Sequence, residues 1–311
     1  ALSTSQVAAM ETADVSNLST QAMAALSSAQ VAALSSDQLA ALKTSQVAAL
    51  STANIASLST AQIVALTSTQ VAALKSEHLA ALSTTQFAAI ETADISRLSS
   101  SAIVGLTTDQ VDALTSDQIA ALTSSQIARL TSTQVAVIGT TELTAMSTAA
   151  ISSLSSTAMN GLSTQQLASL TTAQIASLKT AQIAALDSTD MAALTSDQVV
   201  ALTTTQVSRL STAQVAALTT AQLANMESAD VGNLTSSAIA SLSTQQLAAL
   251  STTQLSALKS NQVAALTTQQ VAALTTDQVV GLSSTQVASL KSSQIAALSS
   301  SQLAAIETAD I

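Results

Sequence analysis

Large aliphatic residues recur along this chain with a period of eight. Counting from Leu2 in steps of eight, all 39 positions up to Ile306 hold Leu, Ile or Met. We number each octad from this residue, so that Leu210 is position one in Leu-Ser-Thr-Ala-Gln-Val-Ala-Ala. Position six is apolar in all 39 copies, and Phe87 is the only aromatic residue among them. Two large apolar side chains per octad are therefore expected in the core.

The polar positions of the octad are constrained unequally. Position three is Ser or Thr in every copy, and position five is Gln in 26 of 39. Positions two and four instead accept charged residues such as Lys43, Glu11 and Asp37. We therefore expect positions two and four to face water.

An octad period does not fit a continuous helix. Eight residues overshoot two turns of 3.6 residues by about 0.8 residue, which rotates the apolar stripe by roughly 80° per octad. The apolar spacing alternates between five and three residues, whereas a helix surface requires three and four. The pattern therefore predicts an all-α solenoid, a superhelix of short capped helical segments with one octad per segment.

Each segment carries a helix-start signal. Ser or Thr followed three residues later by Gln is a capping box, and the flanking aliphatic residues form a hydrophobic staple. The first copy places Ser3 at the cap, Gln6 at the third helical residue, and Leu2 and Val7 in the staple. However, Lys43 stands at the same cap position and offers no acceptor oxygen, so the cap could instead lie at the invariant hydroxyl residue, as at Thr4. The register stays open by one residue.

A β-solenoid is the alternative fold. Eight is even, so positions one, three and five would lie on one face of a strand. Against it, the Val-Ala-Ala-Leu segments favour helix, Ala is poor in strands, and only five Gly are present for tight corners.

Residues 1–311 form one continuous octad array with no linker, and no octad has enough apolar surface to fold alone. The chain begins and ends within an octad, so we expect it to be part of a longer array. Glu-Thr/Ser-Ala-Asp markers suggest ten-octad blocks that start near 11, 147 and 227, with a shortened block at 91–146. Block duplication explains this spacing; alternatively, ten octads are a superhelical or lateral-contact repeat.

Composition excludes several kinds of site. The chain has no Cys, which removes disulfides and thiolate metal sites, and its net charge of −10 argues against nucleic-acid binding. Its apolar runs are far shorter than the roughly 20 residues that cross a membrane. We therefore expect neither nucleic acid nor membrane insertion.

The sequence predicts no catalytic, cofactor-binding or metal-binding residue. His78, the sole His, stands at the Gln position and is expected to replace Gln in a hydrogen bond. Acidic pairs such as Glu11 with Asp14, or Asp187 with Asp190, resemble weak Ca²⁺ ligands, but carboxylates also stabilise a helix N-terminus. We expect no cofactor, no small-molecule substrate and no enzymatic activity.

Tandem Leu-(Ser/Thr)-(Ser/Thr)-x-Gln-(Val/Ile/Leu)-Ala-Ala arrays, as at 210–218 and 282–290, resemble those of giant secreted bacterial surface proteins. Those proteins are adhesin-like or similar to repeats-in-toxin proteins exported by type I systems, although their Gly-Asp calcium nonapeptides are absent from this chain. The resemblance covers the whole chain and implies an extracellular or cell-surface location.

Residues and resemblance together predict a structural repeat protein, either an extracellular filament or the stalk or spacer of a bacterial adhesin. We expect self-association, end to end or lateral, because a repeat array leaves apolar surface at its ends. The alternative function is an ice- or surface-binding solenoid that presents rows of Ser and Thr. Free exchange of Ser and Thr in these rows weighs against a surface that requires the Thr methyl group.

Overall fold

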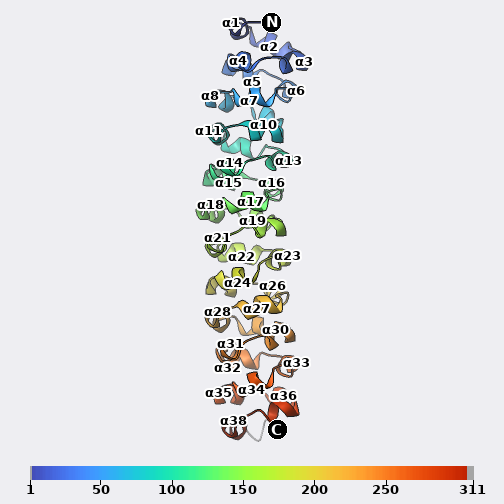
Figure 1. Ribbon diagram of the computed structural model, residues 1–311, viewed down its shortest axis with the longest axis vertical. Coiled ribbons are helices and arrows are strands. Elements are labelled where there is room, and N and C mark those ends of the chain that lie inside the picture. Colours follow the sequence, from blue (N-terminus) through green and yellow to red (C-terminus); the bar gives the residue numbers. More distant parts are fainter. Residues whose placement is uncertain (1, 307–311) are drawn as a thin grey trace. The chain divides into compact units, whose positions relative to one another are not determined.

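The computed structural model describes residues 2–306 as short α-helices joined by brief extended segments (Figure 1). Each octad between Leu2 and Ala305 contributes one helix of four to six residues. No strand occurs within residues 2–306, so the all-α solenoid is confirmed and the β-solenoid alternative is wrong.

The chain divides into two compact units, Ala1–Leu162 and Ser163–Ile311. The boundary lies inside the block predicted to start near residue 147, and the prediction of one array over 1–311 stays a prediction. The first unit contains α1(Thr4–Ala8), α2(Thr12–Asn17), α3(Thr20–Ala24), α4(Ser28–Ala32), α5(Ser36–Ala40), α6(Thr44–Val47), α7(Thr52–Ala56), α8(Thr60–Val64), α9(Ser68–Ala72), α10(Ser76–Ala81), α11(Thr84–Ala88), α12(Thr92–Ile95), α13(Ser100–Ile103), α14(Thr108–Asp112), α15(Ser116–Ala121), α16(Ser124–Ile127), α17(Ser132–Ala136), α18(Thr140–Ala145), α19(Thr148–Ile151) and α20(Ser156–Met159). The second unit contains α21(Thr164–Ser169), α22(Thr172–Ser177), α23(Thr180–Ile183), α24(Ser188–Ala193), α25(Ser196–Val200), α26(Thr204–Val207), α27(Thr212–Ala217), α28(Thr220–Asn225), α29(Ser228–Val231), α30(Ser236–Ala240), α31(Thr244–Ala248), α32(Thr252–Ser256), α33(Ser260–Val263), α34(Thr268–Ala272), α35(Thr276–Val280), α36(Ser284–Ala288), α37(Ser292–Ile295) and α38(Ser300–Ala305).

The helices are short because the chain becomes extended at the junction of two octads. Leu82 at position one has φ −69° and ψ 140°, and Ser83 at position two has φ −65° and ψ 161°. The N–H of Leu82 still donates to the carbonyl of Leu79 at 3.1 Å, which closes the last helical turn. No residue between 2 and 306 has a positive φ, so the helices end without the left-handed glycine that terminates many helices. Five glycines therefore suffice for the whole chain.

Positions one and six form the core, as predicted. Leu79 and Leu82 are 0 % and 4 % exposed, and Phe87 is 1 % exposed. Leu82 precedes the cap of α11 and Phe87 is its fourth helical residue, which are the two positions of a hydrophobic staple. Each such side chain contributes on the order of 1.5–3 kcal/mol when buried. The charged residues Lys43, Glu11 and Asp37 are exposed, as expected for positions two and four.

Within each unit, every helix packs against the helix three places along the chain. Examples are α4 with α7 in the first unit and α24 with α27 in the second. Side-chain bonds to the main chain join residues 28 to 31 apart, as for Gln70 with Leu42 and Leu39. Three octads are 24 residues and four are 32, so one superhelical turn takes between three and four octads.

Candidate functional site

A reciprocal cap begins each typical helix, and it fixes the register that the sequence left open. In α5 the Ser35 N–H donates to Gln38 Oε1 at 2.7 Å, and the Gln38 N–H donates to Ser35 Oγ at 3.1 Å. Ser35 is at position two, and the equivalent residue of α1 is Ser3, not Thr4. The invariant hydroxyl residue at position three is thus the first helical residue.

The same glutamine also joins neighbouring superhelical turns. Gln70 Nε2 donates to the carbonyls of Leu39 at 2.8 Å, Ala40 at 3.3 Å and Leu42 at 2.7 Å. Its Oε1 accepts the Thr67 N–H at 2.8 Å, and the residue is 1 % exposed. One side-chain amide therefore accepts the N–H of the N-cap residue of its own helix. It also donates to carbonyls at the end of a helix in the preceding turn. We call these repeated contacts the glutamine ladder.

The inter-turn half of this ladder was not predicted. A signal for it was present at the lysine-capped octads, because Gln46, Gln182, Gln262 and Gln294 persist where Lys cannot accept a hydrogen bond. In α6 the Gln46 N–H donates to the Lys43 carbonyl at 2.9 Å, while Gln46 Nε2 still reaches Leu18 O at 2.8 Å. Retention of Gln without its hydroxyl partner indicates a second role.

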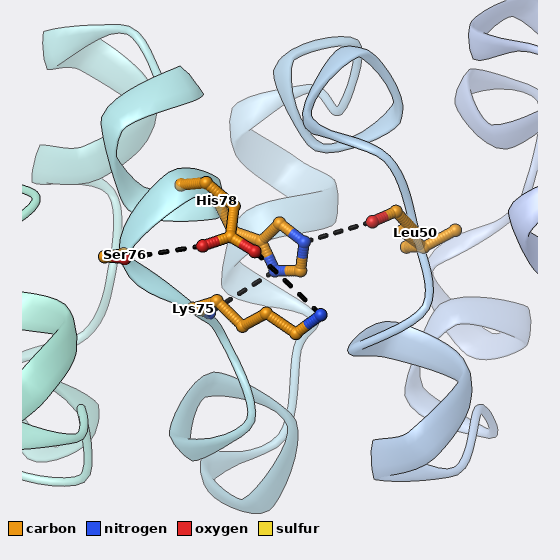
Figure 2. A network of polar contacts seen from close by, with 5 residues as sticks. Leu50, Lys75, Ser76 and His78 are labelled. Atoms are coloured by element: carbon orange, nitrogen blue, oxygen red, sulfur yellow. Dashed lines mark hydrogen bonds and ion pairs between the residues drawn. The ribbon is translucent and has the colours of Figure 1, made fainter.

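His78 replaces Gln in the ladder, as predicted (Figure 2). Its Nδ1 accepts the Lys75 N–H at 3.3 Å, and its Nε2 lies 3.0 Å from the Leu50 carbonyl. Both contacts form together only when the ring is neutral and carries its proton on Nε2. Burial at 2 % exposure lowers the pKa of His78, and the nearby Lys75 charge lowers it further, although the bond to Leu50 and the Glu77 charge oppose this change.

The acidic pair Asp187 and Asp190 makes a cap. The N–H groups of Thr189 and Asp190 donate to Asp187 Oδ1 at 2.7 and 2.9 Å, and the Asp187 N–H donates to Asp190 Oδ2 at 3.0 Å. Burial raises the pKa of Asp190, as does the neighbouring Asp187 charge, while the Asp187 N–H lowers it. Both carboxylates are thus used at a helix N-terminus, the second of the two roles considered for them.

The other acidic pair, Glu11 with Asp14, lies at the start of α2. Glu11 is the N-cap residue, but its side chain makes no cap hydrogen bond. Among residues 2–306, no three His, Asp or Glu side chains lie close enough to hold a metal ion together.

Some octads without Gln use other inter-turn contacts. Asp230 accepts a hydrogen bond from Thr204 Oγ1 at 2.8 Å, and Glu142 accepts one from Ser116 Oγ at 2.9 Å. In the Ala238 octad, Ser241 Oγ donates to the Thr212 carbonyl at 3.2 Å. In both of these carboxylate octads, the donor is the invariant position-three hydroxyl of the preceding turn.

Two octads with Ala at position five have Gly at position eight, and there the turns approach closely. A Cβ on Gly105 would lie 2.6 Å from the Ser76 carbonyl oxygen, and one on Gly161 would overlap the Ser132 carbonyl. Ala102 and Ala158 of these octads are 1 % and 0 % exposed. Gly at position eight leaves room for the preceding turn.

An open depression of about 280 Å³ is lined by Leu2, Leu18, Ala22, Ala25, Leu26 and Gln30. None of these side chains is ionisable, so the depression does not gather groups for acid–base catalysis. Among the helices of residues 2–306, none is long and apolar enough to cross a membrane.

Comparison with known proteins is consistent with the repeat architecture. No curated protein matches the chain. Eight segments match the family model described as the ALTTAQ repeat: residues 7–44, 39–76, 87–124, 135–172, 170–204, 196–226, 223–260 and 254–284. These segments contain 19 of the 26 position-five glutamines, cover more than half of the chain, and show that it belongs to the ALTTAQ repeat family.

Proposed function

We propose that this chain is a non-catalytic structural spacer that forms the stalk or filament of a bacterial surface protein. The observation that carries the proposal is the glutamine ladder. Each amide binds main-chain carbonyls, which every octad possesses whatever its side chains, as Gln70 binds Leu39 and Leu42. An added octad can therefore bind its neighbours through the same main-chain carbonyls. The number of octads then determines the length of the array.

The proposed location is extracellular or on the cell surface. The resemblance of the octad array to adhesin-like and repeats-in-toxin-like proteins exported by type I systems supports this location. The absence of Cys is compatible with an oxidising environment, because no thiol is available for oxidation or mispairing. Labelling of intact cells of the source organism with an antibody against the chain tests the location. Signal that appears only after lysis would reject the location and leave the spacer role standing.

Two deletions test the spacer role: one removes whole octads, and the other breaks the octad at the junction. Removing residues 147–226 deletes ten octads and joins Met146 at position one to Glu227 at position two. We expect a helical, cooperatively folding protein whose maximum dimension in small-angle scattering falls in proportion to the deleted length. Removing residues 147–222 joins Met146 to Leu223 at position six and breaks the octad. We expect this control to lose cooperativity between the two flanking arrays, because the broken octad interrupts the glutamine ladder at the junction. Equal behaviour of the two deletions would reject the period-based spacer.

A filament additionally requires copies of the chain to associate. Sedimentation velocity over a wide concentration range distinguishes a filament from a monomeric spacer. Growth of large species with concentration supports a filament, whereas a constant sedimentation coefficient restricts the role to a monomeric spacer.

A further inference from the structure

One Asn–Gly pair occurs in the sequence, Asn160–Gly161, at positions seven and eight of an octad in the first unit. An Asn side chain can react with the main-chain nitrogen of the next residue, and it reacts fastest before Gly, which has no Cβ to hinder the approach. Each of the other five Asn residues precedes a larger residue, namely Leu, Ile, Met or Gln. Asn160 is exposed at the end of α20. This pair is therefore the position where self-modification is chemically easiest.

The folded turn holds the pair in an unreactive geometry. Asn160 is helical, with φ −67° and ψ −9°. The reaction closes a five-membered ring, which requires the Gly161 nitrogen to be nearly eclipsed with Asn160 Cβ about the Cα–C bond, and this ψ keeps the two atoms apart. The Gly161 N–H also donates to the Ala158 carbonyl at 2.9 Å, which opposes loss of its proton. The reaction therefore requires the end of α20 to unwind.

The surrounding octads favour local unwinding. Asn160 lies in the last of three consecutive octads with Glu142, Ala150 and Ala158 at position five, the longest run in the chain without a side-chain N–H there. A Gln at this position donates to carbonyls of the preceding turn, as Gln134 does in α17. Local opening of the run breaks fewer inter-turn hydrogen bonds than elsewhere, and it therefore costs less free energy.

Gly161 touches the main chain of the preceding turn. A Cβ at Gly161 would overlap the Ser132 carbonyl, so the closed turn leaves no room for additional atoms there. In an isoaspartate, the main chain passes through the former side chain and gains one methylene between residues 160 and 161. That methylene displaces Gly161 from its place beside Ser132. An isoaspartate formed in the opened state is therefore incompatible with closure.

We propose that Asn160–Gly161 is a self-modification site that reacts only when the end of α20 opens, and that its isoaspartate keeps the turn open. In the opened state the Gly161 main-chain nitrogen loses its proton and attacks Asn160 Cγ. A C–N bond forms, and the side-chain amide leaves as ammonia. Water then adds to either carbonyl of the succinimide and gives aspartate or isoaspartate. The reaction consumes one water, releases one ammonia and needs no enzyme.

This inference goes beyond the proposed spacer, because it gives the array one preset position at which age removes the regular winding. It does not rest on the spacer role. The spacer is tested by the length of deletion variants, and the self-modification site is tested by a reaction rate. Either proposal can fail alone.

Ageing of the full chain at mildly alkaline pH tests the requirement for opening. Trypsin releases residues 130–179, and chromatography with mass spectrometry separates the asparagine, aspartate and isoaspartate forms of this peptide. We expect the reaction to be at least about tenfold slower in the folded chain than in concentrated urea, because only the opened fraction reacts. Equal rates in the two conditions would overturn the proposal.

Two methionines provide a matched pair of variants. Met159 and Met23 both stand at position six and are both 0 % exposed, but only Met159 belongs to the reacting octad. We expect Met159→Ala to accelerate the reaction by roughly tenfold or more, because it loosens the packing of α20, and Met23→Ala to leave the rate unchanged. Circular dichroism verifies that both variants fold. Equal acceleration by both would overturn the proposal, because the reaction would then follow global unfolding.

Urea below the unfolding transition of the wild type gives the same comparison if Met159→Ala does not fold. The reaction rate should rise before the helical signal falls, because local opening precedes global unfolding. A rate that rises only together with the loss of helical signal would overturn the proposal.

The effect of the product on the fold is tested with Asn160→Asp and Asn160→Gln. Asn160→Asp adds the carboxylate without lengthening the main chain, and Asn160→Gln greatly slows ring closure. We expect amides of α17 and α20 to exchange with deuterium faster in the aged, isoaspartate-containing wild type than in the fresh protein. Fresh Asn160→Asp and aged Asn160→Gln should exchange like the fresh wild type. Unchanged exchange in the aged wild type would show that the turn closes around isoaspartate and would overturn the proposal.

Discussion

A single buried glutamine links two turns, and an exposed neighbour of the same type provides its control. Gln270 Nε2 donates to the carbonyls of Ile239 and Leu242 at 3.1 and 2.7 Å, whereas Gln269 is exposed. We expect Gln270→Ala to lower the free energy of unfolding by about 1–3 kcal/mol, because buried main-chain groups lose their partner. Gln269→Ala should change it by less than about 0.5 kcal/mol. Urea denaturation followed by circular dichroism measures both.

Gln270→Glu separates hydrogen-bond donation from side-chain size. The carboxylate has nearly the shape of the amide but cannot donate, and it faces carbonyl oxygens. We expect a loss at pH 7 that is partly regained, relative to Gln270→Ala, as the pH falls and the carboxyl group becomes protonated, at a pH above the ordinary Glu pKa of about 4.3 because burial beside carbonyl oxygens raises it. Equal stability of the Gln269 and Gln270 alanine variants would contradict the inter-turn role.

His78 makes stability depend on pH at one position of the ladder. Its folded-state pKa lies below the ordinary value of 6.5, so the unfolded chain binds the proton more readily. Stability should therefore be unaffected above pH 6.5, fall as the pH drops from about 6.5 toward the folded-state pKa, and level off below it. Protonation would also remove the Nδ1 acceptor for Lys75 N–H.

The matched variant for this prediction is His78→Gln, which restores the usual amide. Urea midpoints measured from pH 7.5 to 5.5 should fall for the wild type and stay flatter for His78→Gln. The ionisable groups beside His78 are Lys75 and Glu77 on its own segment, and α7 and α13, which pack against α10, contain no ionisable residue. Parallel pH curves for the two proteins would show that His78 titrates as it does in the unfolded chain.

At the scale of the helix, most of the structure could be predicted from the octad. The Leu82–Phe87 staple and the Ser83–Gln86 reciprocal cap follow from residue type and spacing alone. The cap register could not, because hydroxyl residues stand at both positions two and three, and Lys43 argued against position two. The structure shows why Lys is tolerated there: Gln46 Oε1 still accepts the Lys43 N–H at 2.7 Å.

Close approach between α13 and α10 predicts unequal effects at two glycines. A Cβ on Gly105 would lie 2.6 Å from the Ser76 carbonyl, a main-chain atom that cannot move alone. The Cβ of Gly281→Ala would lie 3.1 Å from Thr252 Cβ, a contact that a shift of a few tenths of an ångström relieves. We expect Gly105→Ala to cost about 1–3 kcal/mol and Gly281→Ala less than about 1 kcal/mol. Thermal unfolding compares them, and equal melting temperatures would refute the close approach.

At the scale of the molecule, the octad pattern predicts an array but not how it winds. The partners of Gln70 lie 28 and 31 residues away, and this separation depends on how many octads fill a turn. That number depends on the angle between consecutive helices, which the backbone dihedrals at positions one and two determine. Residue spacing does not specify these dihedrals. The ten-octad period was visible in the sequence, but the number of octads per turn required the fold.

Octads that lack the position-five Gln predict where the first unit unfolds locally. Asp94 and Ala102 occupy position five in consecutive octads, and neither side chain has an N–H to donate to the preceding turn. The four octads after them carry Gln110, Gln118, Gln126 and Gln134. We therefore expect amides of α12 and α13 to exchange with deuterium faster than those of α14–α17, because local opening there breaks fewer inter-turn bonds.

Asp94→Gln should repair one of these breaks. At the usual separations its Nε2 would meet the carbonyls of Leu66 and Ile63, and its Oε1 would accept the Glu91 N–H. We expect about 1–2 kcal/mol of added stability and slower exchange confined to α12 and the turns it contacts. Asp109→Asn is the control, because it also removes one carboxylate, at an exposed position four of α14. If both variants slow exchange equally, the cause is reduced negative charge, and the ladder does not set the local stability of the array.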